Sequence, residues 1–211
     1  MSKILEIAEA VEKGKQKIIE DLVQEALDEG DSPNAILDDG MVAAMRSIGE
    51  KFQANEVFVP ELLIAAKTMK KGVAILRPHL SSGELGKLGK VIIGTVAGDL
   101  HDIGKNLVAL MIESAGFEVI DLGVDVAPAK FVETLNEHPD CKIVAASALL
   151  TTTMESLKHT VDEVHAAGYK DKVKIMVGGA PVTQEYADLI CADAYTPDAG
   201  SAATKAVELV S

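Results

Sequence analysis

The rest of the chain is best interpreted from one stretch, Gly98-Asp99-Leu100-His101-Asp102-Ile103-Gly104-Lys105-Asn106. An apolar, β-branched run, Val91–Val96, precedes it, and a helical pattern that closes at Gly116 follows it. A buried strand that leads through a polar turn into a helix places His101 at the carboxyl end of the strand. In an open α/β sheet, ligands bind at that end of the strands.

Asp99 and His101 have the spacing of a metal ligand and its supporting carboxylate. Across a turn, the carboxylate of Asp99 can accept the Nδ1–H of the His101 ring, which fixes the tautomer and turns Nε2 outward. Gly98 and Gly104 have no side chain that would keep a bulky group away from the backbone. The Asp-x-His pattern alone is more typical of an ordinary turn with a surface histidine.

Composition restricts the class of protein. Hydrophobic residues make up 48% of the 211 residues, which excludes a disordered chain, and no apolar run approaches the roughly 20 residues of a membrane helix. The chain does not begin with a stretch of signal-peptide type. Cys141 and Cys191 are far apart and suggest neither a zinc site nor a disulfide scaffold. We therefore expect a cytoplasmic protein without a membrane partner.

The charge of the chain bears on its partners. The net charge is −13. Nucleic-acid binding depends on Lys and Arg side chains that neutralise phosphates, so this charge argues against a nucleic-acid partner.

The hydrophobic period changes at residues 79–89, and this change divides the chain. Residues 1–78 show four amphipathic helical patterns joined by short loops, which predict an antiparallel four-helix bundle. Pro33 and Pro60 are expected in the first turns of the third and fourth helices. Residues 79–89 contain three glycines and two serines and are predicted to form a linker that acts as a hinge.

Residues 90–211 alternate short apolar runs with helical patterns. The strands are expected at residues 91–96, 118–122, 142–147, 173–177 and 193–196. The helices are expected near residues 103–115, 128–136, 154–167, 183–190 and 203–210. Five strands alternating with five helices predict a parallel, doubly wound α/β sheet, although the spacing does not give the strand order.

Two further loops follow the third and fourth expected strands. The run Ser147–Met154 carries four hydroxyl groups and no charge, a pattern that is also typical of a threonine-rich helix cap. Gly178 and Gly179 would allow a flat group to lie against the backbone. Because the carboxyl ends of parallel strands meet at one edge, these loops and the first are expected to form one slot. Its expected walls are Gly104, Ser147, Leu149, Gly178 and Gly179.

Asp99-x-His101-x-x-Gly104 resembles the signature of cobalamin-binding domains, and the resemblance covers the whole chain. The helical part is matched through Gly49–Phe52 and Val57–Leu62. The chain is similar to the two-module cobalamin-binding unit of methionine synthase. In size and layout it is more similar to the free-standing corrinoid proteins of methylamine, methanol and methoxyaromatic methyl transfer. The resemblance implies a helical cap domain over 1–78 and a flavodoxin-like, Rossmann-like strand order over 90–211.

The resemblance also implies roles for individual residues. In this family the dimethylbenzimidazole of the cofactor leaves cobalt, and the motif histidine becomes the lower ligand, the base-off/His-on state. His101 would be that metal ligand, with Asp99 and Thr153 as its catalytic relay. The other residues implied to contact the corrinoid in the sheet domain are Gly98, Leu100, Asp102, Ile103, Gly104, Ser147, Leu149, Thr151, Gly178, Gly179, Ala180 and Ala199.

Phe52, Val59 and Leu62 fall on the positions that cap the upper, methyl-bearing face of the corrin in this family. Their periodicity alone favours plain bundle core. Because Val59 stands where methionine synthase has a leucine, the resemblance implies a looser cap.

The function that the resemblance implies is that of a methyl carrier in one-carbon metabolism. The methyl group would travel on cobalt from a substrate-specific methyltransferase to a second methyltransferase that uses coenzyme M or tetrahydrofolate. A reductive activation protein would be a further partner. Such a chain is one component of a methyltransferase system rather than a complete enzyme, and its sequence does not identify the methyl donor.

Two other classes of protein stay open on the sequence. His101-Asp102 also resembles the pair of HD-type metal phosphohydrolases, but the other histidines, His79, His138, His159 and His165, show no matching pattern. A cobalamin-dependent sensor or regulator could use the same two modules. Such sensors usually carry an output domain or DNA-binding helices, for which we expect no spare length here.

Overall fold

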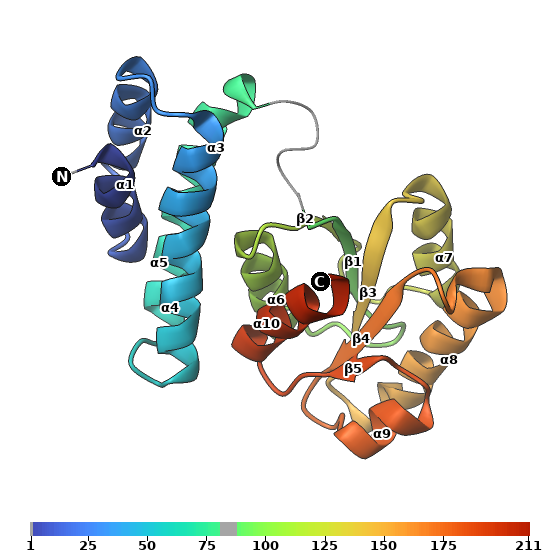
Figure 1. The fold of residues 1–211 in the computed structure, drawn as a ribbon. Helices are drawn as coiled ribbons and strands as arrows, with labels where there is room; N and C mark the ends of the chain where they lie inside the picture. Colours follow the sequence, from blue (N-terminus) through green and yellow to red (C-terminus); the bar gives the residue numbers. More distant parts are fainter. Residues whose placement is uncertain (1, 81–87) are drawn as a thin grey trace. The chain divides into compact units, whose positions relative to one another are not determined.

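A computed structural model gives the fold of the chain and describes residues 2–80 and 88–211 (Figure 1). The chain divides into two compact units, one made mainly of residues 1–87 and one made mainly of residues 88–211. Of the linker and hinge predicted at 79–89, residues 81–87 lie outside the described residues.

The first unit is helical. Its helices are α1 (Lys3–Glu12), α2 (Ile19–Asp28), a continuous run of α3 (Pro33–Ala35), the π-helical segment η1 (Ile36–Val42) and α4 (Ala43–Gln53), then α5 (Val59–Leu76), followed by the 3-10 turn η2 (Arg77–His79). Pro33 and Pro60 lie in the first turns of α3 and α5, as predicted. No helix in the described parts of the chain is long and apolar enough to cross a membrane.

The helices of this unit pack around one apolar centre. α1 packs against α2 and α4, and both of those pack against α5. Fully buried side chains come from every long helix and include Ile7, Ile19, Met41, Met45 and Leu62. The predicted helical bundle is therefore confirmed, with the π-helical segment η1 as a feature that the apolar period did not predict.

The second unit contains a sheet of five parallel strands. These are β1 (Lys90–Thr95), β2 (Glu118–Asp121), β3 (Cys141–Ser147), β4 (Lys174–Gly178) and β5 (Ala194–Tyr195). Their order is β2-β1-β3-β4-β5, the flavodoxin-like order that the resemblance implied. β1 pairs with β2 on one side and with β3 on the other, so the order reverses at β1 and β3. Loops after these strands begin where such folds bind ligands.

Helices cover both faces of this sheet. They are α6 (Ile103–Ser114), α7 (Pro128–Glu137), α8 (Met154–Val164), α9 (Gln184–Leu189) and α10 (Ala199–Val210). α7 and α8 lie on one face, and α6 and α10 lie on the other (Figure 1). Ile92, Val144 and Ile175 point from the strands into a core shared with Phe131 of α7 and Leu157 of α8. Burial of both faces explains why the inner strands β1, β3 and β4 are mostly apolar runs.

Two helix boundaries differ from the sequence prediction. The last helix begins at Ala199 rather than Ala203, because the Asp198 side chain caps it by accepting the N–H of Ser201 at 2.8 Å. α8 ends at Val164 and continues as a π-helical turn, η4 (His165–Tyr169), in which Gly168 has a φ of 83°. The first difference places Ala199, a predicted site residue, at the start of a helix.

Candidate functional site

The predicted pair of Asp99 and His101 forms in the loop between β1 and α6. Oδ1 of Asp99 lies 2.7 Å from Nδ1 of His101 and 3.1 Å from the backbone nitrogen of the same residue. The Asp99 side chain is fully buried, whereas 49% of the His101 side chain is exposed. Because an ionised carboxylate can only accept hydrogen bonds, Nδ1 carries the proton. Nε2 is therefore the ring nitrogen available to a ligand.

The other oxygen of Asp99 joins this loop to the loop after β3. Oδ2 accepts the backbone N–H of Leu149 at 2.7 Å and lies 2.8 Å from Oγ1 of Thr153, which is also buried. The same hydroxyl lies 2.9 Å from the carbonyl oxygen of Leu150, but it has one proton to donate. The ionised carboxylate is the stronger acceptor. The structure thus brings Asp99, His101 and Thr153 together as one hydrogen-bonded chain.

The surroundings of Asp99 keep it ionised. Burial raises the pKa of this carboxyl, but the hydrogen bonds from Leu149, the His101 ring, Thr153 and the His101 backbone together outweigh burial. The pKa of Asp99 is therefore held well below its usual range. The carboxylate can hold the imidazole in one tautomer across the whole neutral range.

Hydroxyl groups at the ends of β1 and β3 support the backbone of the same loop. Oγ1 of Thr95, which is buried, donates to the carbonyl oxygen of His101 at 2.9 Å. It also lies 3.0 Å from Oγ of Ser147. Because the Thr95 proton goes to the carbonyl, Ser147 donates to Thr95. These two hydrogen bonds place Ser147, a predicted site residue, beside the loop that carries His101.

Gly179 has a packing role besides the predicted one. Its φ is 126°, and a Cβ atom there would lie 1.8 Å from the carbonyl oxygen of Ala148. Only glycine therefore allows the loop after β4 to approach the loop after β3. A Cβ on Gly178 would lie 3.2 Å from the carbonyl oxygen of Thr196, whereas one on Gly104 would meet nothing within 4 Å. Gly104 faces open space, as a site for a bulky group requires.

Exposed apolar side chains flank His101. The exposed fractions are 73% for Leu100, 84% for Ile103 and 40% each for Leu149 and Leu150. Large apolar side chains gathered at a ligand-binding edge are typical of a surface that a partner or an apolar ligand covers. Asp102, Thr151 and Ala180 are also exposed, whereas Ala199 is buried in the first turn of α10.

The three predicted capping residues belong to the helical unit. Leu62 is fully buried in its core, Phe52 is half-buried, and 39% of Val59 is exposed. The side chain of Leu62 thus packs as its periodicity alone suggested.

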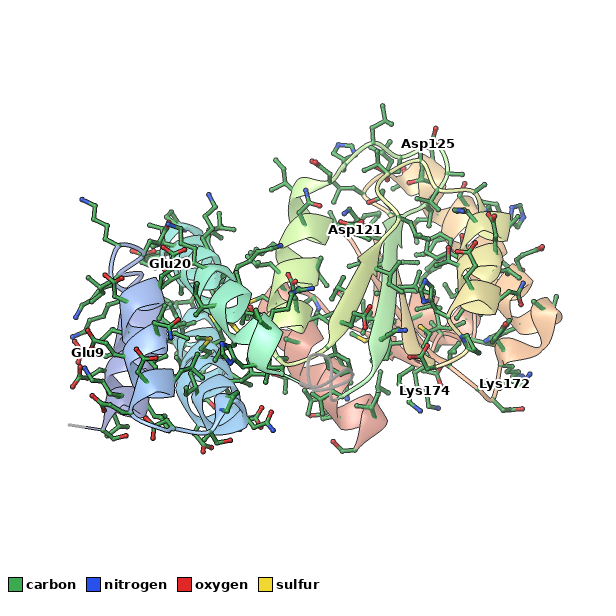
Figure 2. All side chains as sticks on the ribbon, turned by 90° about the horizontal axis from the view of Figure 1, so that it is seen from above. Glu9, Glu20, Asp121, Asp125, Lys172 and Lys174 are labelled. Atoms are coloured by element: carbon green, nitrogen blue, oxygen red, sulfur yellow. The ribbon has the colours of Figure 1, made fainter. Side chains whose placement is uncertain are left out.

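Carboxylates that the sequence analysis did not select also hold the motif. Oδ1 of Asp125, on the loop after β2, accepts the N–H of Gly98 at 2.7 Å. Nζ of the buried Lys105 donates to Oδ1 of Asp121 at 2.7 Å and to Oδ2 at 2.5 Å. Figure 2 labels both aspartates in the sheet unit. Their partners lie 27 and 16 residues away in the sequence, so no local pattern indicated them.

The site is not built to hold a metal by protein ligands alone. Within residues 2–80 and 88–211, no group of three or more His, Cys, Asp or Glu side chains could hold a metal ion. A dinuclear site of the HD type would need several such side chains around His101 and Asp102. The arrangement suits a metal that takes one ligand from His101 and the others from a cofactor.

Comparisons with known proteins identify the same two parts. A B12 binding domain family matches residues 89–208, and a second B12 binding domain family matches residues 4–77. The chain is 42% identical to the trimethylamine corrinoid protein of Methanosarcina barkeri, over 96% of this chain and 94% of that protein. It is 41% identical to the dimethylamine corrinoid protein of the same organism, over 97% and 96% of the two chains.

A solved structure extends the likeness. The methanol:cobalamin methyltransferase complex MtaBC of Methanosarcina barkeri matches with a TM-score of 0.89 and 25% sequence identity. The match covers 99% of this chain and 79% of that chain.

Proposed function

Because this chain belongs to the B12 binding domain family that includes the methylamine corrinoid proteins, we propose that it carries a methyl group between two methyltransferases on a bound corrinoid. The observation that carries this proposal is the buried Asp99 carboxylate that fixes the half-exposed ring of His101. When bound, the corrinoid supplies a cobalt centre that accepts and releases a methyl group, and the protein supplies binding and orientation.

The residues around His101 fit such a group. Nε2 of His101 is the candidate lower ligand of cobalt in the base-off/His-on state. The open space at Gly104 and the exposed side chains of Leu100 and Ile103 suit a large, largely apolar ring. The nucleotide tail is proposed to lie in the slot lined by Ser147, Leu149, Thr151, Gly178, Gly179 and Ala180.

Asp99 and Thr153 are proposed to control the state of the His101 ring. The ionised carboxylate accepts the Nδ1–H and makes the ring a stronger ligand through Nε2. Thr153 donates its hydroxyl proton to the carboxylate and keeps it aligned. This relay holds the ring in one orientation, in which Nε2 would meet the cobalt.

The helical unit is proposed to cover the other face of the corrinoid. The side chains of Val59 and Phe52 are partly exposed and could contact the corrinoid, whereas Leu62 is buried and packs in the core.

The partners are proposed from the relatives. Those relatives are named for trimethylamine and dimethylamine, and the matched complex is named for methanol and cobalamin. Each name pairs a similar corrinoid chain with a different small methylated compound, so a substrate-specific methyltransferase would choose the donor. A second methyltransferase for coenzyme M or tetrahydrofolate, a reductive activation protein and a cytoplasmic location stay predictions.

Corrinoid binding tests the proposed function. The purified chain mixed with hydroxocobalamin should retain about one corrinoid per chain, with a visible spectrum that changes in His101→Ala. His159→Ala, which removes an exposed histidine of α8, is the matched control and should keep the wild-type spectrum. A chain that retains no corrinoid, or an identical spectrum in His101→Ala, would contradict the proposal.

A further inference from the structure

The loop after β2 runs alongside the backbone that leads into His101. The N–H of Thr95 donates to the carbonyl of Gly123, and the N–H of Val126 donates to the carbonyl of Thr95, each at 3.0 Å. Val96 and Val126 form a parallel bridge beyond the last residues of the strands. The loop thus extends the pairing of β1 and β2 toward the motif.

Asp125 makes the last contacts of this pairing. Its Oδ1 accepts the N–H of Gly98 at 2.7 Å, and its own N–H donates to the carbonyl of Asp99 at 2.9 Å. Asp125 has a φ of 53°, in the left-handed region that aspartate and asparagine tolerate better than most residues. Asp125, an exposed residue labelled in Figure 2, therefore holds a backbone group on each side of the Cα atom of Asp99, whose side chain fixes the His101 ring.

The other end of the motif is held from the same segment. Asp121, the last residue of β2, binds the buried ammonium of Lys105 through both oxygens and accepts the N–H of Gly123 at 2.9 Å. Nζ of Lys105 also donates to Oδ1 of Asn106 at 2.7 Å. Residues 121–125 thus hold the motif at both ends, at Gly98 through Asp125 and at Lys105 through Asp121.

We propose that Asp125 is a positioning residue for His101, which fixes the backbone of Gly98 and Asp99 and so aims the imidazole. This inference rests on the proposed function, in which Nε2 of His101 binds cobalt. A functional site has to hold its groups to within about 0.5 Å of the productive geometry, so a ligand on a loop needs such support. Asp99 can hold the imidazole of His101 in a fixed orientation only if the backbone of Asp99 is itself fixed.

Four variants separate the roles of Asp125. Asp125→Ala removes the acceptor, and Asp125→Gly removes it while relieving the backbone strain of a positive φ. Asp125→Asn keeps an oxygen acceptor and tolerates the same φ. Asp193→Ala is the matched control, because Oδ2 of Asp193 also accepts a backbone N–H, that of Ile175 at 2.8 Å, at the opposite edge of the sheet. Because Asp125 is exposed, its replacement is expected to leave the fold intact.

The first readout is the electron paramagnetic resonance spectrum of the cobalamin-loaded full chain reduced to Co(II). Isotopic labelling of histidine with a heavier nitrogen reveals how much of the cobalt has a histidine nitrogen as its axial ligand. We expect the ratio of His-bound to His-free cobalt to fall about tenfold or more in Asp125→Ala and Asp125→Gly, the size expected for a lost charge-assisted hydrogen bond. Asp125→Asn and Asp193→Ala should keep the wild-type ratio.

The second readout needs no corrinoid. Amide hydrogen exchange at Gly98 should become about tenfold faster in Asp125→Gly and stay unchanged in Asp193→Ala. A wild-type spectrum without a histidine nitrogen would overturn the proposed function and this inference with it. A wild-type histidine signal that survives undiminished in Asp125→Gly, or that falls equally in Asp193→Ala, would overturn this inference alone.

Discussion

The loop that carries His101 and the start of α5 in the helical unit both hold predicted cofactor contacts, but they hold them differently. In the loop, hydrogen bonds from two segments, the motif loop itself and the loop after β3, converge on the carboxylate of Asp99, and this buried carboxylate has no equivalent in an ordinary turn. In α5, Leu62 packs as core and Val59 is partly exposed. Several hydrogen bonds that meet at one buried carboxylate therefore indicate a functional site. Apolar side chains that cap a cofactor, in contrast, cannot be told from the core side chains of a helix by their burial.

The largest expected change in stability distinguishes the core residue Leu62 from the proposed capping residue Val59, both in α5. Leu62→Ala should lower the free energy of unfolding of the helical unit by about 2–5 kcal/mol, because it opens a cavity in a fully buried position. Val59→Ala should cost less than about 1 kcal/mol, since its side chain is partly exposed. Urea unfolding followed by circular dichroism measures both changes. Equal losses in the two variants would contradict the assignment of Leu62 to the core.

Removal of the convergent carboxylate is the next largest change. Asp99→Ala leaves the N–H of Leu149 and the Nδ1–H of His101 without their acceptor, and the hydroxyl of Thr153 keeps only the carbonyl of Leu150, which together should cost about 2–4 kcal/mol. Asp140→Ala, which breaks an exposed ion pair with Lys90, is the control and should cost about 0–1 kcal/mol. Denaturant midpoints compare the two. A loss in Asp99→Ala no larger than in the control would show that the convergence adds nothing to stability.

Two glycines of the proposed slot should respond differently to substitution by alanine. Gly179→Ala should destabilise the fold by about 1–3 kcal/mol, because the position has a positive φ and faces the carbonyl of Ala148. Gly104→Ala meets open space and should change stability by less than about 1 kcal/mol, while it weakens corrinoid binding. Thermal unfolding and corrinoid retention measure the two properties separately. Unchanged corrinoid binding in Gly104→Ala would remove this residue from the proposed site.

The smallest effect concerns pH. The folded-state pKa of Asp99 lies below the ordinary value of 3.8. The contribution of this carboxylate to the free energy of unfolding is therefore complete above pH 3.8, and it is lost as the pH falls toward the folded-state pKa. Below the ordinary value, the unfolded chain binds a proton that the folded chain does not. The difference in the free energy of unfolding between wild type and Asp99→Asn should therefore narrow as the pH falls below 3.8, by up to about 1.4 kcal/mol per pH unit. Denaturant unfolding at a series of acidic pH values measures this difference. A gap that widens on acidification would contradict the lowered pKa.

Much of this fold is predictable from local pattern, and the rest depends on partners distant in the sequence. The apolar period gave every long helix and all five strands to within a few residues, because burial of one stripe or both faces dictates it. The strand order came from the resemblance. Asp99 and His101 could be paired because they are two residues apart. Asp125 and Asp121 could not, since their partners, Gly98 and Lys105, are reached only after the sheet has formed.

The central claim is that Nε2 of His101 is a ligand of cobalt, and its most direct test is the Co(II) spectrum of the cobalamin-loaded chain. With histidine labelled by the heavier nitrogen isotope, the nitrogen splitting of the cobalt signal should change in wild type and in His159→Ala. It should be absent or insensitive to the label in His101→Ala. A wild-type splitting that does not respond to labelled histidine would mean that the axial nitrogen belongs to the cofactor, and the account of the Asp99–His101 pair would be wrong.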